Sequence, residues 1–220
     1  MFENLFNPDN PVLSFVNKVV DVLFINILFT LCCLPIFTIG PAMAGLYYCM
    51  VKVIRRERGS AAKEFFRGFR ENFKQGVVVH LILLAFAAMM FVADLPVIIT
   101  FLDTQKIENV MTLVFFGLKA LLLAGFTCWI YPLMTRFSQK LLKLAEFSIG
   151  LMIRYILVTI ISVLIFIGAI VIILAEPLYL AIVPGVAALL ISLPMEKVLR
   201  QVCDTADISD EEDVDTWYLE

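Results

Sequence analysis

Two oppositely charged side chains, Asp94 and Lys119, lie inside long apolar stretches of this sequence. Ionisable groups are costly in a membrane interior, where they mark ion pairs, proton relays or substrate paths. If the chain turns near residue 106, both residues lie about 18 Å of helix from that turn, because an α-helix rises about 1.5 Å per residue. The sequence therefore predicts an intramembrane ion pair between Asp94 and Lys119. A structural clasp between two helices and a relay for protons or substrate are both consistent with such a pair.

The other residue types that could do chemistry form no recognisable site. The sequence has no GxSxG, phosphate-binding loop, HExxH or cofactor pattern. Its five cysteines contain no CxxC pair, and its single histidine, His80, has no neighbouring Cys, Ser or carboxylate pattern. We interpret His80 as a polar residue at a helix interface or facing lipid headgroups. The sequence predicts no catalytic, cofactor-binding or metal-ligating residue, and it favours a protein that is not an enzyme.

The apolar runs that must position these residues define the class of protein. Hydrophobic residues make up 61% of the chain and charged residues 17%, against about a quarter charged in soluble domains. Apolar runs suited to membrane-spanning helices cover 12–34, 41–56, 77–101, 110–133, 155–175 and 178–195. The sequence thus predicts an all-α, polytopic transmembrane bundle of six spans. A break in the Pro- and Gly-containing stretch 34–41 separates the first two spans, and without that break the chain has five.

Lysine and arginine gather in two connections, residues 52–74 and 136–154. Short loops rich in these residues stay on the cytoplasmic side of a membrane. Both basic loops and the C-terminus are therefore expected in the cytoplasm. We expect a single transmembrane domain over residues 1–200, followed by an acidic cytoplasmic tail over residues 201–220, which could be disordered, carry a recognition motif or fold back on the basic loops.

The first basic loop has the pattern of an amphipathic helix over residues 61–75, with Ser60 as the N-cap. Such a helix would lie in the headgroup layer, with its aromatic side chains toward the membrane and its cations toward anionic headgroups. The expected interfacial or partner-docking residues are Phe65, Phe66, Arg67, Phe69, Arg70, Phe73 and Lys74. A topological anchor without a partner is the alternative interpretation. Nucleic acid is not an expected partner, because these phenylalanines would face lipid. Residues 136–154 repeat the pattern more weakly.

The string LPIFTIGPAMAGLYYCMVKVIRRERGSAAKEFFRGFRENFKQG, residues 34–76, carries a family resemblance. With its Leu-Pro, Gly-Pro and Leu-Tyr-Tyr steps, its RRERG run and its FFRGFRENFKQ helix, it resembles the YesL-like family of small bacterial integral membrane proteins of unknown function. The resemblance implies a multi-pass protein of the bacterial cell membrane. It also implies a context, since such proteins are similar to those encoded beside carbohydrate-uptake and glycan-utilisation genes, mostly in Gram-positive bacteria.

Three classes of function follow from these observations. The leading hypothesis is a non-catalytic membrane accessory or scaffold protein that binds a carbohydrate ABC importer or envelope machinery. A small transporter or channel is the second hypothesis, and it requires a polar path through the bundle. A membrane enzyme acting on a lipid or glycan carrier is the third, and it requires a polar pocket near His80 or the basic loops.

Overall fold

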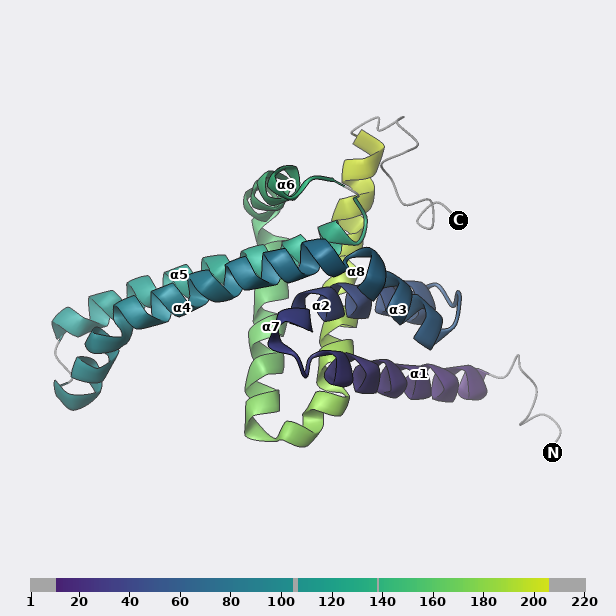
Figure 1. Cartoon of the computed structure of the whole chain (residues 1–220), viewed down its shortest axis with the longest axis horizontal. Coiled ribbons are helices and arrows are strands. Elements are labelled where there is room, and N and C mark those ends of the chain that lie inside the picture. Colours follow the sequence, from purple (N-terminus) through teal and green to yellow (C-terminus); the bar gives the residue numbers. More distant parts are fainter. Residues whose placement is uncertain (1–10, 105–106, 138, 206–220) are drawn as a thin grey trace.

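The computed structural model of the chain is all-helical over the residues that it describes, 11–104, 107–137 and 139–205 (Figure 1). Eleven helical segments follow one another in these residues: α1 (Pro11–Cys32), η2 (Ile36–Thr38), α2 (Ile39–Cys49), η3 (Met50–Arg55), α3 (Ala61–Glu71), α4 (Phe73–Thr104), α5 (Ile107–Met134), α6 (Leu141–Arg154), α7 (Ile156–Ala175), η4 (Pro177–Ala181) and α8 (Val183–Thr205). Segments η2 and η4 are short 3₁₀-helices, and η3 is a π-helix that continues α2.

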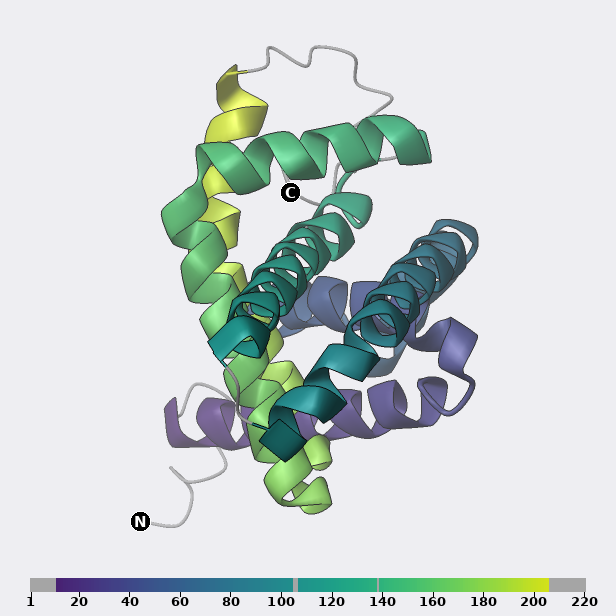
Figure 2. The ribbon, with the colours of Figure 1, turned by 90° about the vertical axis from the view of Figure 1, so that its left-hand side faces the viewer.

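Helix α2 lies at the centre of the arrangement, where it contacts α1, α3, α4, α5 and α8. Helices α4 and α5 form a long hairpin that projects to one side in Figure 1 and lies across the α7/α8 pair. Figure 2 looks at the molecule from the projecting end of this hairpin, with α6 lying over the other helices. Segment η4 connects α7 and α8 at the end of the pair that is far from α6.

Five helices in the described residues are long and apolar enough to cross a membrane. They contain Phe15–Cys32, Ile36–Arg55, Phe73–Pro96, Val114–Met134 and Ile156–Ala175. The prediction of an all-α bundle is confirmed, and the number of candidate spans is five rather than six. The expected last span, 178–195, differs because its residues are divided between η4 and α8, and α8 continues into Glu196, Lys197 and Arg200. These charges reduce the apolar character of α8.

The predicted break between the first two spans is present. Helix α1 ends at Cys32 and α2 begins at Ile39, so the two remain separate elements. The hydroxyl group of Thr38 lies 2.6 Å from the carbonyl oxygens of Cys32 and Pro35, which places a donor at the end of α1 where carbonyls lack partners within the helix. Pro41 lies within the first turn of α2, a position where proline displaces no helical hydrogen bond.

Two close helix crossings explain the glycines around α2. A Cβ atom on Gly40 would lie 2.1 Å from the carbonyl oxygen of Gly76, at the crossing of α2 and α4. A Cβ atom on Gly45 would lie 3.0 Å from the carbonyl oxygen of Phe65, and one on Gly68 would lie 3.0 Å from Cβ of Tyr48. Because glycine has no side chain, it lets two helix backbones approach closely. Such close packing stabilises helix association in a membrane, where the hydrophobic effect between helices is absent. The central position of α2 therefore depends on glycines on three helices.

We expect Gly40→Ala to destabilise the protein, because the added methyl group would meet backbone atoms that cannot rotate away. Overpacking of this kind costs about 1–3 kcal/mol. Gly168→Ala in α7 is the matched control, since its Cβ would have no neighbour within 4 Å. Thermal unfolding in detergent should show a lower midpoint for Gly40→Ala and an unchanged or higher one for Gly168→Ala. Equal midpoints for the two variants would contradict the crossing.

Candidate functional site: a buried charge cluster

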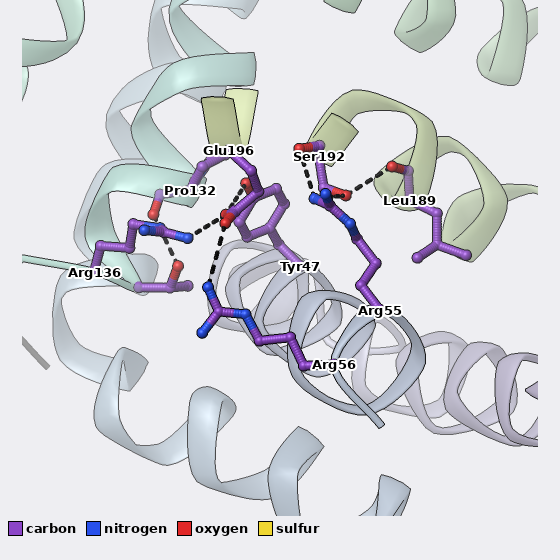
Figure 3. A network of polar contacts seen from close by, with 9 residues as sticks. Tyr47, Arg55, Arg56, Pro132, Arg136, Leu189, Ser192 and Glu196 are labelled. Atoms are coloured by element: carbon purple, nitrogen blue, oxygen red, sulfur yellow. Dashed lines mark hydrogen bonds and ion pairs between the residues drawn. The ribbon is translucent and has the colours of Figure 1, made fainter. Parts of the chain in front are cut away.

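The carboxylate of Glu196 is the centre of a polar cluster between α2, α5 and α8 (Figure 3). Glu196 is 2% exposed, and its Oε1 accepts hydrogen bonds from Nη2 of Arg136 and, at 3.1 Å, from the hydroxyl group of Tyr47. A guanidinium nitrogen of Arg56 lies 4.0 Å from its other oxygen, Oε2. One carboxylate thus connects α8 with α2, with the end of η3 and with the residues that follow α5.

A second contact in Figure 3 joins η3 to α8. Nη1 of Arg55 donates to the carbonyl oxygen of Ser192 at 2.9 Å and lies 3.2 Å from its hydroxyl oxygen. The Ser192 hydroxyl in turn donates to the carbonyl oxygen of Leu189 at 2.7 Å. The wide turn of the π-helix lies directly before Arg56, and such turns inside helices are frequent at functional sites. Two consecutive arginines therefore both reach α8.

A third polar contact fixes α3. Nζ of Lys52 lies 3.1 Å from Oε2 of Glu64 and 3.2 Å from the hydroxyl oxygen of Tyr48. Glu64 is 6% exposed, so this charged side chain lies on the buried face of α3. Because the chain between η3 and α3 turns through Glu57 and Gly59, which have positive φ angles, α3 folds back along α2. The ion pair thus lies inside the protein, where it holds α3 against this central helix.

The cations of these contacts bind different kinds of acceptor. Lys52 pairs with Glu64, Arg56 and Arg136 lie against Glu196, and Arg55 donates to Ser192. Arginine does not release its proton in proteins, so the three guanidinium groups serve as hydrogen-bond donors and not as proton shuttles. The arrangement can hold helices in register and attract anions. In the residues that the structure describes, no group of three His, Cys, Asp or Glu side chains could hold a metal ion.

The structure brings the two predicted intramembrane residues together. Nζ of Lys119 in α5 lies 2.5 Å from Oδ2 of Asp94 in α4. The Asp94 side chain is 11% exposed and the Lys119 side chain 43%. The turn of this hairpin, residues 105–106, lies outside the described residues. The pair therefore joins α4 to α5.

The predicted helix over 61–75 needs correction in its length and in the face that it buries. Helix α3 ends at Glu71, Asn72 separates the helices, and Phe73 and Lys74 belong to α4. Phe65 is fully buried against α1 and α2, so it does not face lipid or a partner. The buried face consists of Ala61, Glu64, Phe65 and Gly68. Ser60 occupies the predicted N-cap position, without a hydrogen bond from its side chain.

The remaining residues of the predicted docking set lie on the outside or are half-buried. Phe66 and Phe73 are 41% and 38% exposed, and Phe69 is half-buried between the rings of Phe65 and Phe73. Arg67, Arg70 and Lys74 are exposed, and Nε of Arg67 donates to Oε1 of Glu71 at 2.9 Å. Sequence periodicity thus found the cationic surface but not which aromatic residues are buried.

His80 lies at the interface of α4 and α5, where its Nδ1 is 3.2 Å from the hydroxyl oxygen of Tyr131. Its position agrees with a polar residue at a helix interface. Glu176 is exposed at the end of α7. The tail residues from 206 onward lie outside the described residues, and α8 itself runs to Thr205.

The Glu196 cluster was not predicted from the sequence, although a signal existed. Glu196 is the first charged residue after an uncharged stretch that begins at Pro177, and Arg136 is the first cation after the fifth helix. The first acid and the first cation beyond two apolar helices are candidates for an ion pair. Arg136 was assigned only to the second basic loop, and no role was assigned to Glu196.

The fold and the buried charges define an all-helical, multi-pass membrane protein, in which charged helix ends are held inside the bundle. Residues 19–95, roughly a third of the chain, match the model of a family described as "Protein of unknown function, DUF624". The expected resemblance to an uncharacterised family is thus confirmed for the segment that contains residues 34–76, and it carries no function with it. Neither the curated proteins nor the solved structures gave a match to this chain.

We expect Glu196→Gln to destabilise the protein, because the buried Arg136 guanidinium would lose its counter-charge. Removing one partner of a buried pair costs about 3–5 kcal/mol. Arg136→Met should cost a similar amount, and the Arg136→Met/Glu196→Met double variant should cost less than the sum of the single changes. Thermal unfolding in detergent measures these differences, and Lys197→Met is the exposed neighbouring control. Additive effects of the two changes would show that the pair is not coupled.

For the Asp94–Lys119 pair, we expect Asp94→Lys and Lys119→Asp to lower the yield of folded protein separately. The swap Asp94→Lys/Lys119→Asp should restore most of that yield, since an ion pair of reversed sense remains possible at the same depth. Size-exclusion profiles of detergent extracts measure the folded fraction. If the swap is as poor as the single variants, the pair does not act as a clasp between α4 and α5.

Proposed function

We propose that this protein is a non-catalytic membrane accessory protein that holds a partner through the outer face of α3. The observation that carries this proposal is the mounting of that helix. One face of α3 is fixed to α2 by the Gly45 and Gly68 contacts and by the Lys52–Glu64 pair. The opposite face exposes Phe66, with Arg67 beside it.

A rigid helix that displays an aromatic residue beside arginines has the composition of a binding surface. Aromatic residues and arginine are enriched in the centres of protein interfaces. A surface whose backbone is already ordered loses less conformational entropy on binding than a flexible loop does. The packing of α3 on α2 therefore favours recognition by Phe66 and Arg67 over a helix that only marks the membrane boundary.

The buried charge cluster supports the structural part of the proposal. Its donors and acceptors bind one another, as Arg136 binds Glu196 and Arg55 binds Ser192. Two permanently charged arginines against a carboxylate, with a third bound to Ser192, suit the fixing of helix positions better than proton transfer. A scaffold needs such fixed positions, because its binding surface must keep one shape.

A cavity inside the bundle bears on the transporter hypothesis. It has a volume of about 240 Å³ and lies between α1, α2, α5, α7 and α8. Its lining includes Phe29, Leu46, Phe166 and Ile191, and is mostly apolar. A lining of this kind favours lipid chains or loosely packed helices over a path for polar solutes. We therefore prefer the accessory function to that of a small transporter.

The proposed partner is a membrane subunit of a carbohydrate importer in a Gram-positive bacterium, with envelope machinery as the alternative. Support for this context comes from the resemblance of residues 34–76 to the YesL-like proteins. The cationic outer face of α3 suits a partner with an acidic cytoplasmic surface, because complementary charges guide association.

A photo-crosslinking experiment in native membranes tests the proposal. Phe66 is replaced by the photoreactive analogue benzoylphenylalanine, whose ring system suits a position that is already aromatic and 41% exposed. The same analogue at Leu157, an exposed position on α7, is the matched control. We expect a crosslinked importer subunit from position 66 and only lipid adducts from position 157.

The identity of the crosslinked species decides the outcome. Arg67→Glu in the Phe66 variant should reduce the importer crosslink severalfold, because it reverses a charge at the contact. Crosslinks to lipid alone, or to a second copy of the chain alone, would overturn the accessory function.

A further inference from the structure

A polar cleft lies between the α3–α4 junction and the end of α5. Its volume is about 570 Å³, within the roughly 300–1,000 Å³ of small-molecule sites. One wall consists of the consecutive residues 70–75, and the other of residues 134–137. This cleft lies at the C-terminal end of α3, whereas Phe66 lies in the middle of that helix.

The charges around the cleft favour an anion. Its lining contains three cations, Arg70, Lys74 and Arg136, and one carboxylate, that of Glu71. Glu71 already pairs with Arg67, which lies outside the cleft. Among the residues that the structure describes, neither Arg70 nor Lys74 forms an ion pair. Two exposed cations therefore remain at the cleft for an external anion.

The walls of the cleft are held in place by their own hydrogen bonds. The Asn72 side chain donates to the carbonyl oxygen of Gly68 at 2.9 Å, and the Thr135 hydroxyl donates to that of Pro132 at 2.8 Å. A third hydrogen bond joins segments that are 64 residues apart in the sequence: Nε2 of Gln75 donates to the carbonyl oxygen of Gln139 at 3.1 Å. A site held in this way needs little reorganisation when a ligand enters.

Arg136 places a positive charge behind the wall of the cleft. It is 4% exposed, and its guanidinium group is turned toward Glu196 inside the bundle. The planar guanidinium fork matches the oxygen geometry of phosphate, which explains the preference of phosphate sites for arginine. The exposed Arg70 offers such a fork at the cleft, and Lys74 adds a second exposed cation.

The position of the cleft identifies the source of the anion. One candidate membrane span begins at Phe73 and another ends at Met134, and both residues line the cleft. The ends of adjacent spans lie at the level of the lipid headgroups. Phe73, 38% exposed at the rim, offers an apolar surface on which the start of an acyl chain can lie. A lipid presents both a phosphate and such a chain.

We propose that this cleft binds the phosphate headgroup of an anionic membrane lipid, through Arg70 and Lys74, with the buried positive charge of Arg136 behind them. The lipid enters from the membrane with its phosphate between the α3–α4 junction and the end of α5. The site goes beyond partner docking, because its ligand and its residues 134–137 play no part in the contact at Phe66.

Native mass spectrometry of the full-length protein in detergent tests the site, with phosphatidylglycerol and phosphatidylcholine as probes. We expect one phosphatidylglycerol molecule to bind in preference to phosphatidylcholine. Arg70→Glu/Lys74→Glu should weaken that binding by at least about tenfold, since each cation near an anionic headgroup contributes appreciably to affinity. Arg58→Glu/Lys63→Glu has the same change in net charge on exposed residues outside the cleft and should change the affinity by less than about twofold.

Two other results of this experiment would overturn the proposed lipid site. An equal loss in both double variants would show attraction to the whole basic surface and would overturn the cleft as a site. Both variants are expected to keep the unfolding midpoint of the wild type, because the four residues are exposed. Competition by inorganic phosphate, at a concentration where chloride has no effect, would assign the cleft to free phosphate and overturn the lipid ligand.

Discussion

The carboxylate of Glu196 joins parts of the chain that are far apart in sequence. Its partners Tyr47 and Arg136 lie 149 and 60 residues away. A buried charge that loses its partner is far more costly than an exposed one, so the ends of α5 and α8 cannot shift independently without exposing or stranding a charge. The position of α2 is fixed by the same carboxylate through Tyr47. Arg136 also lines the cleft between the α3–α4 junction and the end of α5.

Close backbone contacts fix the spacing between helices, which the ion pairs do not fix. An ion pair tolerates changes in helix spacing, whereas the Gly40–Gly76 crossing leaves no room for a single methyl group. Both crossings of α2 lie within residues 19–95, the segment that matches the uncharacterised family. The Gly-Pro step, Tyr48 and the glycines of this segment lie where α2 approaches α3 and α4.

The sequence predicts those features that depend on local patterns. Apolar runs gave the helices, Pro and Gly residues gave the break before α2, and the hairpin turn placed Asp94 and Lys119 at one depth, where the structure brings them together. Local patterns do not predict contacts between helices that are distant in the sequence. Nothing in the period of α3 distinguishes a face that meets α2 from one that meets lipid, because both are apolar, and Phe65 was misplaced for that reason. Glu196 was missed because its partners come from helices remote in sequence.

The basic connections illustrate why a count of charges does not describe a surface. Arg55, Arg56 and Arg136 bind acceptors on α8, and their positive charge is partly offset within the protein. Arg70 and Lys74 remain exposed at the end of a span, where water and headgroups solvate them. The free-energy cost of burying a charge in the bundle is offset only by a partner in the right geometry. An exposed cation, by contrast, interacts with any anion nearby. The first group therefore determines how the helices pack, and the second determines what the packed helices attract.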